Sequence, residues 1–378
     1  MQYSFTSEQH QFREVVQRFM KDKSPATEVR RLMETDAGFD ADVWKDLSGQ
    51  LALAAIPIPE RYGGAGFGFV ELGIVMEEMG RTLLCAPYFS SVVLAANAIL
   101  NAGTEQQKQQ LLPDIASGKT RAALAMTEPN GRWESSGIEL ISEPAGDHFL
   151  LTGEKSFVVD GGTAELLIVV ARLKGSDGDA GISFFTVHGD ASGLNRRGLN
   201  AMDQTRKLTH LKFSGVEANL LGGAGDAGQA LSKTLDQGAI ALANEMIGGA
   251  QCLLDSSVAY SKLRMQFGRV IGSFQAIKHK CANMLIQLEL AKSAAYVAAA
   301  AVETEGANVP ALASMAKSAA SDAYMLIAAE AIQIHGGIGF TWDQDTHLWF
   351  KRAKSSEVFL GDSTYHRELM MLRWGEGV

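Results

Sequence analysis

The sequence predicts an α+β protein that is mainly α, with an N-terminal helical domain, a central β-barrel or sandwich and a C-terminal four-helix bundle. Apolar residues recur at helical spacing over residues 1–120 and again over residues 223–378. Residues 121–222 instead carry short β-rich runs separated by turn residues. A chain of 378 residues is also too long for one small core, so two or three packed domains are expected.

The N-terminal domain begins with a clear helix signal. Thr6 and Gln9 have the spacing of a capping box, and apolar residues follow them at helical intervals. Gly and Pro residues over 57–66 interrupt any periodic element, so this stretch is predicted to be a loop. Further helices are predicted over residues 41–50, 70–83, 86–102 and 105–116, with Thr104 as the cap of the last.

The β-rich segment predicts a small antiparallel barrel or sandwich. Its apolar runs are short, and turn clusters such as residues 175–181 and 189–193 separate them. The predicted strands cover residues 148–152, 156–159, 166–173, 182–188 and 210–213.

The C-terminal domain returns to long helices with few breakers. Ala, Leu, Ile and Met recur there at helical spacing, which is typical of a bundle. The predicted helices cover residues 227–263, 271–303, 310–335 and 360–373.

Composition narrows the functional classes. A net charge of −9 without a basic stripe argues against a nucleic-acid partner. Three widely spaced cysteines suggest neither a disulfide framework nor a zinc site, and no group of residues has metal-ligand spacing. The sequence shows no secretory signal and no uninterrupted apolar stretch of about 18 residues. We therefore expect a cytoplasmic protein without a membrane span.

Two segments about seventy residues apart suggest a nucleotide site. The first is Arg264-x-x-Phe267-Gly268, followed by Phe-Gln275-Ala-Ile, and the second is Gln333-Ile-His-Gly336-Gly337. A guanidinium matches a pyrophosphate with paired, charge-assisted hydrogen bonds, and glycines let backbone N–H groups approach phosphate closely. Taken singly, an Arg near a helix end complements the helix dipole, and a Gly-Gly pair more often stops a helix.

Together with residues 357–363, these segments resemble the acyl-CoA dehydrogenase family, and the resemblance covers essentially the whole chain. It implies FAD bound across a subunit interface, with Arg264 on the pyrophosphate, Phe267 packed against the cofactor and Gln275 on the adenosine diphosphate portion. Gln333, Gly336 and Gly337 complete that site, and Thr127 contacts the flavin. The implied reaction is α,β-dehydrogenation of an acyl-CoA substrate, after which an electron-transfer flavoprotein reoxidises the flavin.

The chain departs from the family where flavin chemistry occurs. Leu360 stands where most members have the glutamate that removes the substrate α-proton, so no catalytic residue is assigned. Some relatives carry this glutamate on an earlier helix, but the matching position here is Gly238. Val159 replaces a threonine whose hydroxyl lies near the flavin, and Asp362 puts an anion near the pyrophosphate. The turn over residues 130–134 is bulkier than the usual Gly- and Ser-rich one.

Two other carboxylates are candidate bases. Glu245 lies seven residues after Gly238, nearly on the same helical face, although a paired structural carboxylate is the simpler interpretation. Asp362 is shorter than glutamate and needs a shifted backbone to reach the same carbon.

The C-terminal tail suggests a branch of the family. Gly361-Asp362-x-x-x-His366 resembles the tail of the small subunits typified by pimeloyl-CoA dehydrogenase, which assemble with unlike chains into mixed tetramers. Taken alone, His366 would be interpreted as a partly exposed helix histidine. Two hypotheses follow for this chain. It is catalytic as a homotetramer with an unusual base, or it is a partner subunit that lends FAD-binding residues to a hetero-tetramer. An acyl-CoA oxidase or a flavin monooxygenase on the same fold is a minor alternative.

Overall fold

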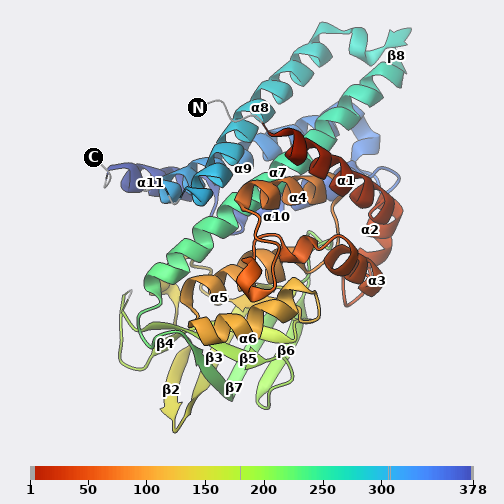
Figure 1. Cartoon of the computed structure of the whole chain (residues 1–378). Helices are drawn as coiled ribbons and strands as arrows, with labels where there is room; N and C mark the ends of the chain where they lie inside the picture. Colours follow the sequence, from red (N-terminus) through yellow and green to blue (C-terminus); the bar gives the residue numbers. More distant parts are fainter. Residues whose placement is uncertain (1–4, 179, 305, 307, 376–378) are drawn as a thin grey trace. The chain divides into compact units, whose positions relative to one another are not determined.

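The computed structural model describes residues 5–178, 180–304, 306 and 308–375 (Figure 1). The order of elements is helical, then β, then helical, as the sequence predicts. The described residues form two compact units. The first lies within Met1–Arg30, Phe69–Leu84 and Ala239–Val378, and the second within Arg31–Gly68 and Cys85–Gly238.

The first unit contains the N-terminal helix and the C-terminal bundle. The capping box of α1 is confirmed, because Gln9 N–H donates to Thr6 Oγ1 at 3.2 Å and Thr6 N–H donates to Gln9 Oε1 at 2.9 Å. Helices α8, α10 and α11 all pack against α9, and α4 packs against α1 and α8. The bounds are α1 Ser7–Lys23, α4 Phe69–Thr82, α7 Gly228–Leu263, α8 Gln275–Glu303, α9 Val309–His335, α10 Thr346–Val358 and α11 Ser363–Gly375.

Glycines let α4 and α7 approach each other closely. A Cβ at Gly80 of α4 would lie 1.9 Å from the carbonyl oxygen of Glu245, and one at Gly248 of α7 would lie 1.8 Å from that of Glu77. No larger residue fits either position without moving a backbone. The carboxylate at position 245 is therefore held at a tight helix crossing.

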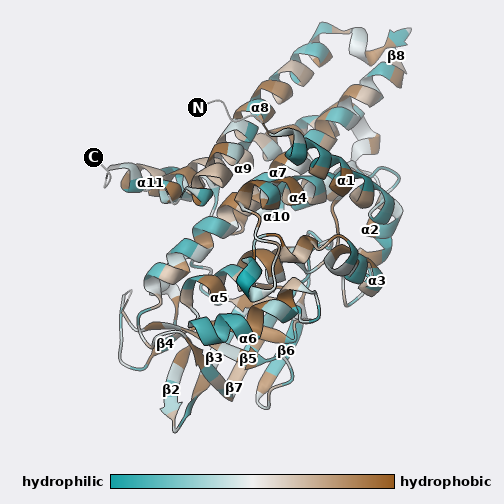
Figure 2. Ribbon diagram, in the orientation of Figure 1, coloured by the Kyte–Doolittle hydropathy of each residue, from teal (hydrophilic) through white to brown (hydrophobic). Residues whose placement is uncertain are grey.

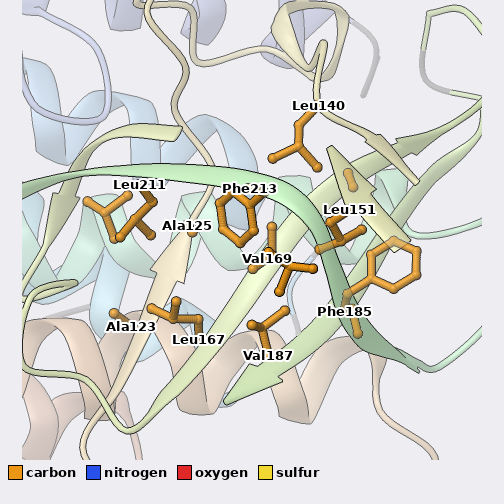
Figure 3. Packing of buried hydrophobic residues seen from close by; sticks show 14 of the residues in the cluster. Ala123, Ala125, Leu140, Leu151, Leu167, Val169, Phe185, Val187, Leu211 and Phe213 are labelled. Atoms are coloured by element: carbon orange, nitrogen blue, oxygen red, sulfur yellow. The ribbon is translucent and has the colours of Figure 1, made fainter. Parts of the chain in front are cut away.

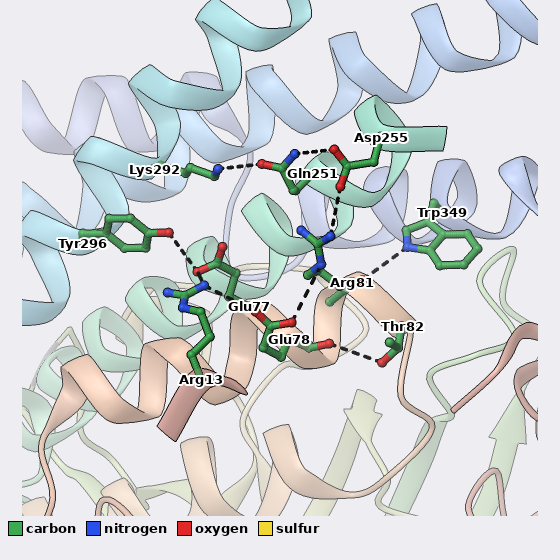
Figure 4. Close-up of polar contacts among 11 residues, drawn as sticks. Arg13, Glu77, Glu78, Arg81, Thr82, Gln251, Asp255, Lys292, Tyr296 and Trp349 are labelled. Atoms are coloured by element: carbon green, nitrogen blue, oxygen red, sulfur yellow. Dashed lines mark hydrogen bonds and ion pairs between the residues drawn. The ribbon is translucent and has the colours of Figure 1, made fainter. Parts of the chain in front are cut away.

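Ion pairs and hydrogen bonds reinforce the packing around α4 (Figure 4). Glu77 accepts hydrogen bonds from Arg13 of α1 at 2.7 Å and from the Tyr296 hydroxyl of α8 at 2.9 Å. Arg81 donates to Asp255 of α7 at 2.9 Å. These contacts connect α4 to three other helices, and those with Arg13 and Tyr296 account for the buried carboxylate of Glu77.

Helix α8 is long and apolar enough to cross a membrane by length and composition alone. Core helices of bundles pass the same test, and α8 packs along α9 within the first unit. The helix therefore gives only weak evidence for a membrane span.

Several helical predictions need correction. The helix predicted over residues 227–263 is confirmed as α7, but the hairpin of β8 Met265–Gln266 and β9 Arg269–Val270 that follows it was not predicted. Arg264 therefore lies just past the helix, although its N–H still donates to Tyr260 O. Helices α2 Ala26–Met33 and α10 were not predicted. The segment predicted as helix 41–50 is α3 Ala41–Lys45 followed by a π-helical turn.

The second unit begins with short helices that cover a β-barrel. Residues Phe89–Ala95 form a π-helix that continues as α5 Ala96–Ala102, and α6 Glu105–Ala116 starts with the predicted Thr104 cap. The first half of α6 reads Glu-Gln-Gln-Lys-Gln-Gln, and the helix is drawn mostly hydrophilic in Figure 2. Its solvent side is accordingly polar.

The β-sheet closes into a barrel, but it is mixed rather than antiparallel. Strand β4 pairs in parallel with β1 and β2, while its pairing with β5 closes the ring β4-β2-β3-β7-β5. An apolar cluster that includes Leu151, Val169, Phe185 and Phe213 fills the interior (Figure 3). The bounds are β1 Ala122–Ala125, β2 Ile141–Ala145, β3 His148–Val159, β4 Leu166–Leu173, β5 Ile182–His188, β6 Leu194–Leu199 and β7 Leu208–Leu221.

The predicted strands 166–173 and 182–188 are confirmed, whereas 148–152 and 156–159 are one strand, β3. Gly153 lies within β3 at φ 143°, next to a shift in the register with β7. The glycine that suggested a break between two strands therefore marks a local irregularity within one strand. Strands β1, β2 and β6 were missed.

Candidate functional site

The structure brings the two candidate nucleotide segments together at one end of the first unit. Tyr260, one turn before Arg264, stacks on His335 with ring centroids 4.4 Å apart, and its hydroxyl donates to His335 O at 3.5 Å. His335 in turn lies two residues after Gln333 and directly before Gly336. Segments distant in sequence are thus adjacent in space.

Phe267 stands at the tip of the β8–β9 hairpin with 91% of its surface exposed. Phe267 has φ 51° and Gly268 has φ 77°, so both turn residues are left-handed, as a two-residue hairpin of this type requires. A phenylalanine in this strained conformation with almost no contact surface is unusual for an isolated subunit. Its ring is available for a ligand or a neighbouring chain.

Gln275 is the first residue of α8 and is exposed, as are Arg264 and Gln333. An ion pair between Lys280 of α8 and Glu330 of α9 holds the two helices together near these residues. The exposed polar side chains therefore stand on a fixed support.

The two glycines of the second segment, Gly336 and Gly337, are explained by different physical reasons. Gly336 has φ 68°, which favours glycine, whereas Gly337 has no positive φ. A Cβ at Gly337 would meet no atom within 4 Å. Neither backbone conformation nor internal packing explains that glycine, whereas close approach by a phosphate-bearing ligand would. The exposed segments thus fit the pyrophosphate of FAD.

Leu360 lies in the turn between α10 and α11 and is 5% exposed. Its φ of 60° places an ordinary side chain in the left-handed region. Such conformations cost about 1–3 kcal/mol and persist only where the surroundings determine them. The turn therefore keeps a specific geometry although its side chain has no ionisable group.

Two buried basic residues hold this turn by its carbonyl groups. Lys317 of α9 donates to Glu357 O at 3.0 Å and to Gly361 O at 2.8 Å, and His366 Nε2 donates to Leu360 O at 2.8 Å. Burial lowers the pKa of Lys317 to about 7. Burial and the nearby Lys317 lower the pKa of His366 to about 4, so this imidazole is neutral near pH 7.

His366 is 3% exposed, so its interpretation as a partly exposed helix histidine was wrong. A role for Lys317 was not predicted either, although a single lysine among alanines and serines in a helical segment was a signal for it.

Asp362 caps helix α11. Its carboxylate accepts a hydrogen bond from Tyr365 N–H at 2.8 Å, and its carbonyl accepts one from His366 N–H. The helix N-terminus favours this anion. Asp362 thus has a structural role that accounts for its charge without a pyrophosphate or a catalytic proton.

Glu245 pairs with Arg352 of α10 inside the first unit. Both side chains are only 4% exposed, and Arg352 Nη1 donates to Glu245 Oε1. The structure favours the simpler interpretation of Glu245, as a paired structural carboxylate.

The candidate flavin-contact residues lie in the second unit. Thr127 follows β1, and its carbonyl accepts a hydrogen bond from Ser156 N–H at 2.8 Å. Val159 at the end of β3 is buried, whereas Phe157 is 43% exposed with φ 59°. The Phe157 ring is available at the surface of the barrel.

Comparison with known proteins supports one family over the full chain. The family models for the N-terminal, middle and C-terminal domains of acyl-CoA dehydrogenases match residues 6–119, 123–216 and 227–374. An acyl-CoA dehydrogenase of Bacillus subtilis (strain 168) is 34% identical, with 96% of each chain covered. The caffeyl-CoA reductase-Etf complex subunit CarC of Acetobacterium woodii is 31% identical, covering 95% of this chain and 96% of CarC.

A solved structure agrees with these matches. Butyryl-CoA dehydrogenase from Megasphaera elsdenii has a TM-score of 0.91 at 29% identity, covering 100% of this chain and 99% of the other. The fold, with helical, β and helical domains, is that of these enzymes. The chain belongs to the acyl-CoA dehydrogenase family.

Proposed function

We propose that the chain is an FAD-binding subunit of a tetrameric acyl-CoA dehydrogenase and that it does not supply the base for the α-proton. The observation that carries this proposal is the state of the three candidate base positions. Position 360 is a buried leucine, Glu245 is in a buried ion pair, and Asp362 caps a helix. A base contributes about 10²–10⁴-fold to such a reaction, so the chain alone is a poor dehydrogenase.

The residues that would hold FAD are Arg264, Phe267, Gln275, Gln333, Gly336 and Gly337, with Thr127 near the flavin. Bound FAD supplies the hydride acceptor, and the protein orients it. The exposed Phe267 and the open space over Gly337 support contact with a cofactor shared between subunits. The named substrates and partners of the relatives support an acyl-CoA substrate and an electron-transfer flavoprotein as the electron acceptor. The cytoplasmic location and the acyl-CoA catabolic role are further parts of this proposal.

FAD binding is tested by Arg264→Met. Lys262→Met is the matched control, because Lys262 is an exposed cation two residues away at the end of α7. We expect R264M to lose most bound FAD on purification, since one charge-assisted pair to a pyrophosphate is removed, and K262M to keep it. Equal FAD content in both variants and the wild type would contradict the assignment of Arg264.

The missing base is tested by co-purification. The chain should co-purify with a different member of the family that carries a glutamate at the position equivalent to 360. The mixed assembly should then oxidise acyl-CoA with a dye acceptor. A homotetramer that turns over acyl-CoA alone at the rate of the mixed assembly would refute the proposal.

A further inference from the structure

The barrel contains a fully buried ammonium group. Lys155 of β3 is 0% exposed, and its Nζ donates to Glu128 Oε1 at 2.6 Å and to Met126 O at 2.8 Å. Burial lowers the pKa of this lysine to about 8, which shows how unfavourable the site is for a charge. Among the described residues, the partners that compensate this charge by hydrogen bonds lie on the segment Met126–Glu128.

Glu128 extends the contact to a third segment. Its Oε1 also accepts a hydrogen bond from Leu140 N–H at 2.9 Å, and its Oε2 accepts one from Glu139 N–H at 2.8 Å. The ion pair therefore joins the end of β1, the approach to β2 and the middle of β3. All three meet beside the apolar core of the barrel.

The residue between Met126 and Glu128 is Thr127, and it is fixed from both sides. Lys155 binds the carbonyl of Met126 and the side chain of Glu128, while Ser156 N–H donates to Thr127 O at 2.8 Å. Among the hydrogen bonds of the described residues, none uses the Thr127 hydroxyl. That hydroxyl is therefore held in place and uncommitted.

Lys155 of this ion pair also lies two residues before the strained Phe157. The register between β3 and β7 shifts between Lys155 and Val158, which turns the Phe157 ring outward at φ 59°. A bulky residue keeps such a conformation only where its neighbours determine it. Lys155 anchors one side of this bulge, and buried Val158 anchors the other.

Stability alone does not explain the pair. A buried ion pair is often no better than apolar residues of similar volume, because desolvation offsets the attraction between the charges. Directional contacts from one ammonium to two neighbours of Thr127 fix geometry, which an apolar side chain would not do.

We propose that Lys155, through Glu128, is a positioning residue that sets the Thr127 hydroxyl and the Phe157 ring for contact with the flavin. This inference rests on the proposed function, because it requires that the chain binds FAD. Lys155 itself touches no cofactor and takes no part in proton or hydride transfer.

The test compares FAD dissociation constants and bound-flavin spectra for the full chain and three variants. Lys155→Met removes the ammonium, and Lys155→Met with Glu128→Gln removes both charges so that no buried carboxylate is left unpaired. Lys212→Met is the matched control, because Lys212 is an exposed lysine on the neighbouring strand β7. Circular dichroism checks folding, and the double variant decides the result if K155M does not fold.

We expect K155M and the double variant to bind FAD about tenfold or more weakly, with the flavin spectrum shifted toward that of free FAD. K212M should match the wild type in both measurements. Wild-type affinity and spectrum in the folded double variant would overturn the inference, since the pair would then serve only stability. A wild-type chain that binds no FAD would overturn the proposed function, and this inference with it.

Discussion

Replacing Glu245 with glutamine distinguishes a structural carboxylate from a catalytic base. The substitution keeps the shape of the side chain and removes its charge, which leaves the Arg352 guanidinium without its anion. Both side chains are 4% exposed, so solvent cannot compensate the remaining charge. Breaking a buried pair in this way costs about 3–5 kcal/mol. That is a large part of the ~5–15 kcal/mol that stabilises a typical folded protein.

The assay is urea denaturation followed by circular dichroism, with the initial rate of flavin reduction by acyl-CoA measured in the mixed assembly. E245Q should lower the denaturation midpoint strongly, and E245Q combined with Arg352→Met should recover most of the loss. The rate per folded, FAD-loaded site should stay within about twofold of the wild type, because no proton transfer passes through Glu245. A stable E245Q protein with flavin reduction slowed about a hundredfold would refute the structural assignment.

Three further predictions follow from the turn that carries Leu360. Leu360→Glu should raise acyl-CoA turnover of the chain by about 10²–10⁴-fold in a dye-reduction assay, because it installs a base on a turn already held by Lys317 and His366; Leu360→Gln, which has no base, is the control. Asp362→Ala should lower the unfolding free energy by about 0.5–2 kcal/mol through loss of the cap, and Asp362→Asn should retain most of it. The pKa of Lys317 is about 7 in the folded chain against 10.5 as its ordinary value, so between these pH values only the unfolded chain binds the proton. The unfolding free energy of the wild type, compared with that of Lys317→Met, should therefore rise with pH in this range, by up to about 1.4 kcal/mol per pH unit. A difference between the two proteins that does not change with pH would contradict a lysine that is buried in its neutral form.

Long periodic elements were predictable from the sequence. Helices α7, α8 and α9 begin and end close to the predicted residues, because apolar residues recur in them at helical spacing over many turns without a breaker. The hairpin at Phe267 was not predictable by the same means. Its strands have two residues each, and its turn depends on a phenylalanine in a conformation that usually requires glycine or asparagine.

Some features of the candidate site were likewise predictable from the sequence, and others were not. Motif spacing predicted that Arg264 and Gln333 serve one nucleotide site, and the Tyr260–His335 contact explains how their segments meet. The absence of a base at position 360 was also visible in the sequence. The roles of the other carboxylates were not, because Glu245 finds its partner 107 residues away.

The capping role of Asp362 was also not predictable from its charge beside a glycine motif. The sequence suggested an anion near a pyrophosphate, and the structure shows that the carboxylate has a cap position at the start of α11. Predicting this would have required the helix to begin at Ser363 rather than residue 360. A shift of a few residues in a predicted helix boundary thus decides between a structural and a catalytic interpretation.

The central claim, that this chain binds FAD but lacks the base, is tested most directly by one anaerobic measurement. The purified chain, loaded with FAD, is mixed with a series of acyl-CoA thioesters, and bleaching of the flavin absorbance is followed in a stopped-flow instrument. The account predicts bound FAD that acyl-CoA leaves oxidised, or reduces about 10²–10⁴-fold more slowly than in the L360E variant. Fast reduction in the wild-type chain alone, unaffected by L360E, would contradict it.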